Sequence, residues 1–297
     1  MSTFALEAHG LGKRYRSTWA LRDCTLGIPA GSVAALVGPN GAGKTTLLHL
    51  AVGLTSPTTG SVQILGSSSR EQPHVVLPRV GFVAQEHPLY RRFRIHEMLK
   101  VGAKLNPTWD DGLARQRLER LEIPLDQKVG TLSGGQQAQV ALTFALAKRP
   151  ELLLLDEPVA QLDPLARREF LQSLMESVAE GGLTVLLSSH IIADLERVCD
   201  YMILLAQSQV QLAAPIDEII GSHRVLTGPR SDPSAVARVH SVIRVSHTAR
   251  QTTLIVRANG HLYDSRWAID EIGLEEIVLA YLGRPAGEPS TPEAVAS

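Results

Sequence analysis

Hydrophobic and polar positions follow more than one period along the first part of the chain. Residues 4–28 alternate between apolar and polar side chains, which predicts an antiparallel β region. Short and almost wholly apolar runs come later, and such runs are typical of parallel strands that are buried on both faces of a sheet. They cover residues 32–37, 80–84, 152–155 and 183–189, and residues 61–66, 201–206 and 209–213 are further predicted strands.

Helical periodicity separates several of these strands. It occupies residues 46–52, 95–104, 113–121, 136–148, 165–179 and 191–199. Strands that alternate with helices predict an α/β fold, and the helices between residues 86 and 150 predict a helical insertion within it. Residues 66–78, which are rich in serine and proline, are predicted to form a surface loop.

The pattern changes again after residue 221. Residues 224–227, 241–247 and 251–257 alternate in the manner of edge strands, and residues 274–282 have the pattern of an amphipathic helix. We therefore predict a main domain over residues 1–220 and a small α+β accessory domain over residues 221–283. The proline-rich residues 284–297 are predicted to be a disordered tail.

The clearest chemical motif is the octapeptide at residues 38–45, Gly-Pro-Asn-Gly-Ala-Gly-Lys-Thr. It fits the pattern G-x-x-x-x-G-K-[ST] and lies between a predicted strand and a predicted helix, so free N–H groups and the positive helix end would face an anion. Lys44 is predicted to contact the β- and γ-phosphates, and the Thr45 hydroxyl to bind magnesium. The sequence therefore predicts a nucleoside triphosphate site.

Two carboxylates follow the apolar run at residues 152–155. In a doubly wound sheet, Asp156 and Glu157 would lie at the carboxyl edge, close to the phosphate loop. Asp156 is expected to hold magnesium, directly or through water, and Glu157 to polarise the attacking water. The alternative for a pair of this kind is an acidic surface turn after a core strand.

A second predicted anion site lies at residues 132–136, Leu-Ser-Gly-Gly-Gln, where a helix begins with Thr131 or Ser133 as its cap. The chain thus has two predicted phosphate-binding surfaces, but it has a single phosphate-loop lysine, Lys44, and a single carboxylate pair, Asp156 and Glu157. The simplest explanation is that the second surface serves a site on another subunit. The alternative is a flexible helix start.

Composition narrows the class of protein. A formal net charge of −1 gives no reason to expect binding to nucleic acid. No apolar run reaches the roughly 18–20 residues that cross a bilayer, and a signal-peptide pattern is absent at the start, so we expect a cytoplasmic location. Cys24 and Cys199 do not have metal-binding spacing and are expected to be reduced, buried thiols.

Taken together, the motifs resemble those of the nucleotide-binding subunit of an ATP-binding cassette (ABC) transporter, over about residues 4–220. They occur in the family's order: the phosphate loop, Gln85 at a strand end, the signature at residues 132–136, residues 152–157, Leu162-Asp163, and His190. The resemblance implies a P-loop NTPase fold of ABC type with an antiparallel β subdomain and a helical insertion, and it implies that ATP and Mg²⁺ bind.

The resemblance also implies roles for individual residues. Tyr15 would stack on adenine, with Trp19 as the competing candidate, and Asp163 would bridge two subunits, although it is also a plausible helix cap. Gln85 and His190 would act with Glu157 in hydrolysis, and Gln85 would contact magnesium with Thr45 and Asp156. The nucleotide contacts implied are Gly38, Pro39, Asn40, Gly41, Ala42, Gly43, Lys44, Thr45, Thr46, Ser133, Gly134, Gly135 and Gln136.

Two positions depart from the family's usual pattern. Gln139 stands where arginine is usual, which puts the packing of its helix in question but not hydrolysis. Ala160 and Gln161 precede Leu162-Asp163 where a pair such as Ser-Ala is common, so the contact between subunits can differ there.

The resemblance implies a head-to-tail homodimer or heterodimer that closes on two ATP molecules and drives separate integral membrane permease subunits. The chain would then lie at the inner face of the membrane. Export is expected over import, because a single cassette with a small C-terminal appendage resembles the subunits of multidrug- and antibiotic-type exporters. The alternatives are a translation factor, a DNA-repair ATPase and a regulatory ATPase of the same superfamily, but tandem cassettes with a charged linker and a long coiled coil are missing from this sequence.

Overall fold

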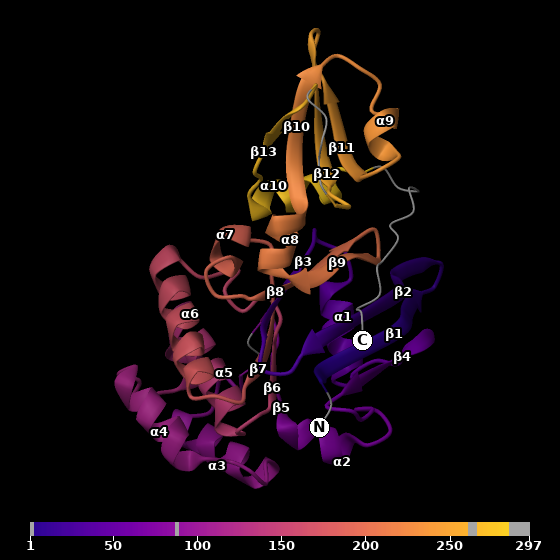
Figure 1. Ribbon diagram of the computed structural model, residues 1–297. Coiled ribbons are helices and arrows are strands. Elements are labelled where there is room, and N and C mark those ends of the chain that lie inside the picture. The colour runs from indigo at the N-terminus through magenta and orange to yellow at the C-terminus, as the bar shows by residue number, and fades with distance from the viewer. Residues whose placement is uncertain (1–2, 87–88, 261–265, 285–297) are drawn as a thin grey trace.

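The computed structural model describes residues 3–86, 89–260 and 266–284. At its centre is a six-stranded sheet in the order β5-β6-β7-β3-β8-β9 (Figure 1). Its neighbouring strands are parallel except β8 and β9, which are antiparallel. The strands are β3 (Val33–Val37), β5 (Val80–Val83), β6 (Leu152–Leu155), β7 (Thr184–Ser189), β8 (Tyr201–Ala206) and β9 (Gln209–Pro215).

One face of the central sheet is covered by α1 (Lys44–Ala51) and by a three-stranded antiparallel sheet. That sheet has the order β2-β1-β4 and consists of β1 (Phe4–Tyr15), β2 (Thr18–Pro29) and β4 (Thr59–Ile64). Leu47 and Leu48 of α1 share one hydrophobic cluster with Leu36 and Leu154 of the central sheet. The predicted antiparallel β region and the helix after the phosphate loop are therefore confirmed.

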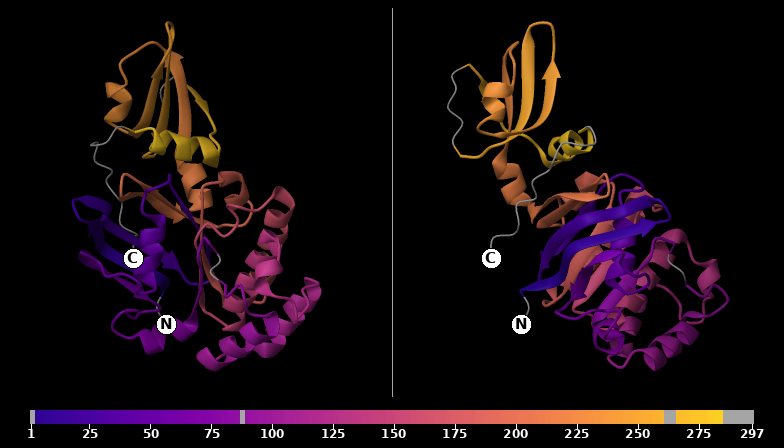
Figure 2. Two further views of the ribbon diagram at one scale, coloured as in Figure 1. Left: turned by 180° about the vertical axis from the view of Figure 1, so that it is seen from behind. Right: turned by 90° about the vertical axis from the view of Figure 1, so that its right-hand side faces the viewer.

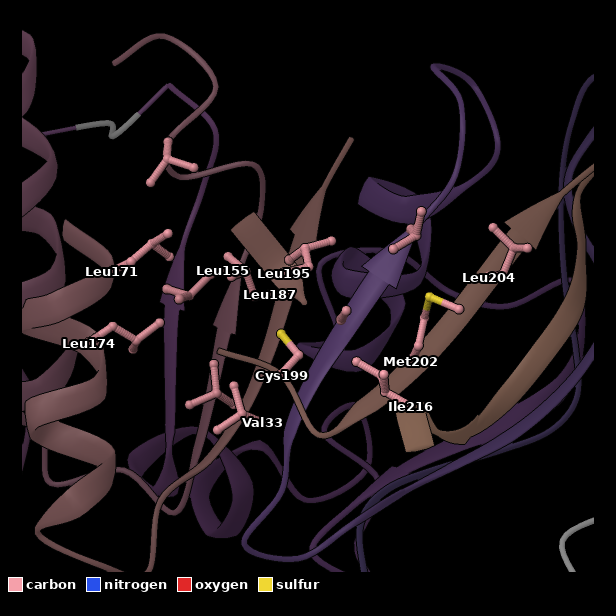
Figure 3. Close-up of a cluster of buried hydrophobic side chains, with 14 of the residues drawn as sticks. Val33, Leu155, Leu171, Leu174, Leu187, Leu195, Cys199, Met202, Leu204 and Ile216 are labelled. Atoms are coloured by element: carbon pink, nitrogen blue, oxygen red, sulfur yellow. The ribbon is translucent and has the colours of Figure 1, made fainter. Parts of the chain in front are cut away.

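The opposite face is covered by helices. The helical insertion contains α3 (Ile95–Leu105), α4 (Asp111–Arg120) and α5 (Gly134–Ala147), and α6 (Pro164–Ala179) and α7 (Ile192–Leu195) follow β6 and β7. Leu171 and Leu174 of α6 point toward Leu155 and Leu187 of the sheet (Figure 3). Because successive residues of a strand face opposite ways, the wholly apolar strands fill the cores on both sides of the sheet.

The C-terminal part of the chain stands at one end of this body (Figures 1 and 2). Its four-stranded antiparallel sheet has the order β11-β12-β10-β13. Its elements are α8 (Ile216–Ser222), β10 (His223–Pro229), α9 (Ser234–Ala237), β11 (Ser241–His247), β12 (Gln251–Arg257), β13 (Ala268–Asp270) and α10 (Leu274–Leu282). One face of the sheet has its own small core, which includes Leu254, Val256 and Trp267.

The helix α10 joins this C-terminal unit to the central sheet. Ile277 and Tyr281 of α10 belong to the same hydrophobic cluster as Met202 and Leu204 of β8 and Leu195 of α7. The two parts therefore share one core. The division of the chain near residue 220 stays a prediction, and the predicted tail, apart from Arg284, lies outside the described residues.

Three predictions about local structure were wrong in detail. The predicted loop at residues 66–78 contains α2 (Pro73–Val76), which begins with proline at its first turn and continues into a 3₁₀ turn at Leu77–Arg79. The predicted helix at residues 191–199 is a single turn, α7. Of the predicted edge strands, β10 and β12 lie inside their sheet, and β11 is at its edge.

Candidate functional site: a phosphate loop beside two carboxylates

The phosphate loop connects β3 to α1, and two of its glycines are required by close packing. A Cβ atom at Gly38 would lie 2.3 Å from the Leu205 carbonyl oxygen at the end of β8. Gly43 precedes the first turn of α1 with a φ of 107°, and a Cβ there would lie 2.4 Å from the Ala20 carbonyl oxygen. Side chains at these positions would displace the backbone, so the loop depends on glycine.

Lys44 is buried at the beginning of α1, with 5% of its surface exposed. Its Nζ donates a hydrogen bond to the Gly38 carbonyl oxygen at 2.8 Å and lies 3.1 Å from Glu157 Oε1. A buried ammonium group needs such partners because desolvation of a charge is costly. The lysine of the phosphate loop is thus held by the carboxylate that follows β6.

A line of polar contacts runs along the ends of β6 and β7. Ser188 Oγ donates to Asp156 Oδ1 at 2.9 Å and accepts the Glu157 N–H at 2.8 Å. His190 Nδ1 lies 3.2 Å from Glu157 Oε2. The structure therefore brings Lys44, Asp156, Glu157 and His190 together at one edge of the sheet.

Glu157 has a strained backbone, with a φ of 44°. A glutamate in the left-handed region is uncommon and costs on the order of 1–3 kcal/mol. The Ser188 and Lys44 contacts hold it there and turn its carboxylate toward the phosphate loop. This strain at a predicted catalytic position is typical of functional sites.

The remaining predicted residues of this edge are more open to solvent. Thr45 and Gln85 are exposed, and Thr46 is half-buried.

Asp156, only 1% exposed, uses one carboxylate oxygen for Ser188, and its Oδ2 has no hydrogen-bond partner among the described residues. Hydroxyl, amide and carboxylate oxygens are ligands that suit Mg²⁺, which is commonly held by one or two carboxylates together with phosphates. These residues therefore fit the implied magnesium ion.

The two candidate adenine-stacking aromatics differ in exposure. Tyr15 is 49% exposed at the end of β1, with Lys13 Nζ 5.0 Å from the centre of its ring. Trp19 is half-buried, with the Arg14 guanidinium 5.6 Å from its ring. Tyr15 thus offers the more accessible ring face.

The signature residues begin α5 and are not part of this cluster. Ser133 is the helix cap: its Oγ accepts the Gln136 N–H at 3.2 Å, and Gln136 Oε1 accepts the Ser133 N–H at 3.1 Å. Ser133 and Gly134 are exposed and Gly135 is half-buried. Because α5 covers the opposite face of the sheet from α1, the structure does not bring residues 133–136 to the phosphate loop of the same chain.

Asp163 and Gln139 have clear local environments. Asp163 caps α6: its carboxylate accepts hydrogen bonds from the N–H groups of Leu165 and Ala166 at 3.0 Å each. This is the helix cap that the sequence offered as the alternative to a bridge between subunits. Gln139 is buried in α5, and its Oε1 has no hydrogen-bond partner in the described part of the chain.

Ser188 and Leu205 are the residues that sequence reasoning missed. Ser188 lies in the predicted strand before His190, and the pair of serines at the end of that buried strand, Ser188 and Ser189, is the sequence feature that could have indicated it. Leu205 acts through its backbone, so its side chain carried no signal.

The described residues contain no metal site built from protein side chains alone. In residues 3–86, 89–260 and 266–284, no group of three His, Cys, Asp or Glu side chains is arranged to hold a metal ion. Both cysteines are free and buried, and burial raises the pKa of the Cys199 thiol to about 12. None of the described helices is long and apolar enough to cross a membrane.

Comparison with known proteins decides the family. Residues 21–160 match the family described as ABC transporter, and residues 125–196 also match one described as AAA domain, putative AbiEii toxin, Type IV TA system. The chain is 33% identical over 238 residues to the Nod factor export ATP-binding protein I of Rhizobium leguminosarum bv. viciae, with 74% of this chain and 76% of the relative covered. The chain belongs to the ABC transporter family.

Other relatives of this ABC subunit agree. It is 27% identical to the bacitracin transport ATP-binding protein BcrA of Enterococcus faecalis over 277 residues, which cover 92% of this chain and 88% of the relative. The structure of an ATP-binding subunit of an ABC transporter superposes with a TM-score of 0.65 at 30% identity, covering 72% of this chain and 91% of the other.

A dimeric ABC cassette in a post-hydrolysis state, bound to ADP and Pi, superposes with a TM-score of 0.64 at 26% identity. The superposition covers 71% of this chain and 98% of that cassette. The chain is therefore an ATP-binding, ATP-hydrolysing subunit of ABC type, with the expected P-loop fold. The alternatives outside transport are not favoured.

Proposed function

We propose that this ABC subunit pairs head to tail with an identical or related subunit and that two ATP molecules bind between them. Lys44 and His190 of one subunit would contact the γ-phosphate from one side. Residues 133–136 of the other subunit would contact it from the opposite side, with helix N-terminal N–H groups that suit an anion. The phosphate-loop residues 38–46 would wrap the remaining phosphates, and Tyr15 would stack on adenine.

The observation that carries this proposal is the position of the two anion-binding surfaces on opposite faces of one sheet. Lys44 begins the helix on one face, whereas Ser133 begins a helix that packs on the other. A rigid chain cannot close both on one phosphate group. Two chains arranged head to tail can do so, and the arrangement forms two equivalent sites.

Hydrolysis would use the polar edge formed by β6 and β7. Glu157 is the base that takes a proton from the attacking water, and Gln85 and His190 orient that water and the γ-phosphate. Magnesium, held through Thr45, Asp156 and Gln85, would supply charge neutralisation for the phosphates when bound. Ser188 keeps Asp156 and the Glu157 backbone in position.

ATP binding has a direct consequence for the lysine–glutamate pair. A γ-phosphate beside Lys44 offers the ammonium group more negative charge than Glu157 does, so Glu157 is released to accept a proton. Because the γ-phosphate contacts both subunits, its cleavage removes the bridge between them and the pair reopens. That cycle of closure and opening would be passed to membrane subunits through the helical insertion, residues 86–150.

Export is the direction we propose, with integral membrane permease subunits as the partners and the inner face of the membrane as the location. The support is the similarity to relatives named as a Nod factor export protein and a bacitracin transport protein. The bacitracin relative matches along 92% of this chain, so the likeness extends into the C-terminal unit.

The test is ATP hydrolysis and ATP-dependent dimerisation of Glu157→Gln beside the unchanged protein. The variant is expected to bind ATP, to lose most of its turnover, and to accumulate as a dimer in light scattering when ATP is present. Glu151→Gln is the matched control, because Glu151 precedes β6 whereas Glu157 follows it, and its partner is the exposed Arg79.

Two results would count against the proposal. Normal hydrolysis by Glu157→Gln would mean that Glu157 is not the base. A variant that binds ATP without hydrolysing it, yet stays monomeric, would mean that residues 133–136 do not act across subunits.

A further inference from the structure

The C-terminal unit contains a hollow of about 730 Å³ that is separate from the nucleotide site. It lies between the α9–β11 segment, from Pro233 to Val245, and the end of α10 at Gly283 and Arg284. Pockets of about 300–1,000 Å³ are typical of small-molecule sites. Its size therefore suits one small organic molecule.

The polar side of the hollow is positively charged. Arg238, Arg244, Arg284 and His240 line it, and the lining residues include neither aspartate nor glutamate. Asp232 interacts with Arg238 from outside the lining, and it is already held by the Ser234 N–H at 3.0 Å and the Ser234 hydroxyl at 2.6 Å. Arg238 and Arg244 on a wall that has no carboxylate favour an anionic ligand.

His240 supplies a hydrogen-bond donor in this lining. It is 8% exposed, and its Nδ1 accepts the Asn259 N–H at 3.1 Å. In the neutral ring this contact assigns the proton to Nε2, and Nε2 has no hydrogen-bond partner among the described residues. This N–H group is available to donate a hydrogen bond to an oxygen atom of a ligand.

The other side of the hollow is apolar. Val239 and Val245, which are 57% and 40% exposed, line it. Val242 and Ile243 also border the hollow, but their side chains pack into two different hydrophobic cores. Apolar side chains around a few converging polar groups are the usual composition of a ligand site. The ligand that suits both sides carries an acidic group and an apolar body.

We propose that this hollow is a binding site for a small amphiphilic anion, a carboxylate, sulfonate or phosphate attached to an apolar group. Arg238 and Arg244 pair with the acidic group, His240 donates a hydrogen bond to it, and the exposed Val239 and Val245 contact the apolar body. None of the residues that line the hollow belongs to the proposed ATP site or to residues 133–136.

A pair of fluorescent probes that differ chiefly in charge tests the site. 8-Anilino-1-naphthalenesulfonate is an amphiphilic anion, and N-phenyl-1-naphthylamine is its neutral counterpart. Each is titrated into the full chain with saturating Mg-ADP, which keeps the probes out of the nucleotide site. The sulfonate is expected to bind at least about tenfold more tightly than the neutral probe, because only the sulfonate accepts charge-assisted hydrogen bonds from the arginine side chains.

The double variant Arg238→Gln/Arg244→Gln is expected to lose at least about tenfold in sulfonate affinity while its affinity for the neutral probe is unchanged. Both arginines are exposed, so the fold tolerates their replacement. The control Arg70→Gln/Arg168→Gln removes two exposed arginines elsewhere and is expected to bind both probes as the unchanged chain does.

Three results would overturn the proposal. They are equal affinity for the two probes, a sulfonate affinity unaffected by the Arg238/Arg244 variant, and sulfonate binding that appears only after residues 285–297 are removed. In the last case the chain's own tail would be the occupant. None of these results bears on hydrolysis by Glu157, so failure here is distinct from failure of the proposed ATP cycle.

Discussion

The Lys44 ammonium lies 3.1 Å from a carboxylate oxygen of Glu157, so the predicted phosphate ligand and the predicted catalytic base neutralise each other in this state. Both groups are largely buried, with side-chain exposures of 5% and 11%. Removing one partner of a buried pair leaves the other charge uncompensated, which is costly. In the proposed site, nucleotide binding would therefore exchange one partner of Lys44 for another instead of filling an empty position.

Replacement of Lys44 by alanine is expected to weaken ATP binding by about 10- to 150-fold, since a charged hydrogen bond is worth about 1.5–3 kcal/mol. Titration with a fluorescent ATP analogue measures the change. Lys148→Ala is the matched control, because Lys148 donates to the carbonyl oxygens of Leu77 and Val80. It should lower stability but keep ATP affinity. Unchanged affinity in Lys44→Ala would refute the assignment.

Ser133 has two separable roles, as a helix cap and as a predicted phosphate contact. Aspartate and asparagine both cap helices as well as serine does, so Ser133→Asp and Ser133→Asn should retain the stability of α5. Only the aspartate places a negative charge where the phosphate of the other subunit would bind. We expect Ser133→Asp to bind ATP as a monomer but to lose dimerisation and hydrolysis, with Ser133→Asn less affected. An active, dimerising Ser133→Asp would disprove the contact.

The buried imidazole of His223 predicts a loss of stability in mild acid. Its Nε2 lies 3.0 Å from the Tyr281 hydroxyl and its Nδ1 2.6 Å from the Ile219 carbonyl oxygen. Burial, with a smaller contribution from Arg257 and Arg224, lowers the pKa of His223, although the Ile219 contact opposes this. Below about pH 6.5 the unfolded chain therefore binds a proton that the folded chain does not.

The free energy of unfolding should consequently fall as the pH drops below about 6.5, by at most about 1.4 kcal/mol per pH unit from this group. Urea unfolding at pH 7.5 and 5.5 measures the fall, and His223→Gln should show a smaller one. His74→Gln, which changes an exposed histidine, should behave as the unchanged chain does. Equal falls in all three proteins would exclude His223 as the source.

The shared core predicts that the C-terminal unit and the cassette unfold together. Ile277 of α10 is 0% exposed, and large-to-small changes at such positions cost about 2–5 kcal/mol. Ile277→Ala should lower the urea midpoint of the whole chain in a single transition. Leu279, on the same helix but 51% exposed, is the control, with a change of about 0.5 kcal/mol or less. Two separate transitions would contradict a shared core.

The motifs and the apolar runs predicted most of the fold because both depend on local chemistry. A glycine loop between a strand and a helix has few alternatives, and wholly apolar runs of four to six residues fit strands that are buried on both faces. For this reason β3, β6 and β7 and their polar ends at Lys44, Glu157 and His190 lie where the sequence predicted. The carboxyl ends of parallel strands meet at one edge whatever else the chain does.

The incorrect predictions concern which strands are neighbours in a sheet, and an alternating sequence pattern contains no information on this. An alternating pattern reports that one face of a strand is buried, but it carries no information on which strands lie beside it. Hence β10 and β12 were predicted at an edge although they lie inside their sheet. Likewise, Ser188 contributes to the site through its hydrogen bonds to Asp156 and the Glu157 backbone, which depend on the register of β6 and β7.

The shared core has a consequence for the order in which the chain folds during synthesis. The helix α10 contacts β8, which pairs with the strand that leads into the phosphate loop, yet α10 is made about 80 residues after β8. At about 5–20 residues per second, the ribosome needs on the order of 4–16 s to supply it. During that interval Met202 and Leu204 lack their final cover, so a growing chain carries an open apolar surface beside its nucleotide site.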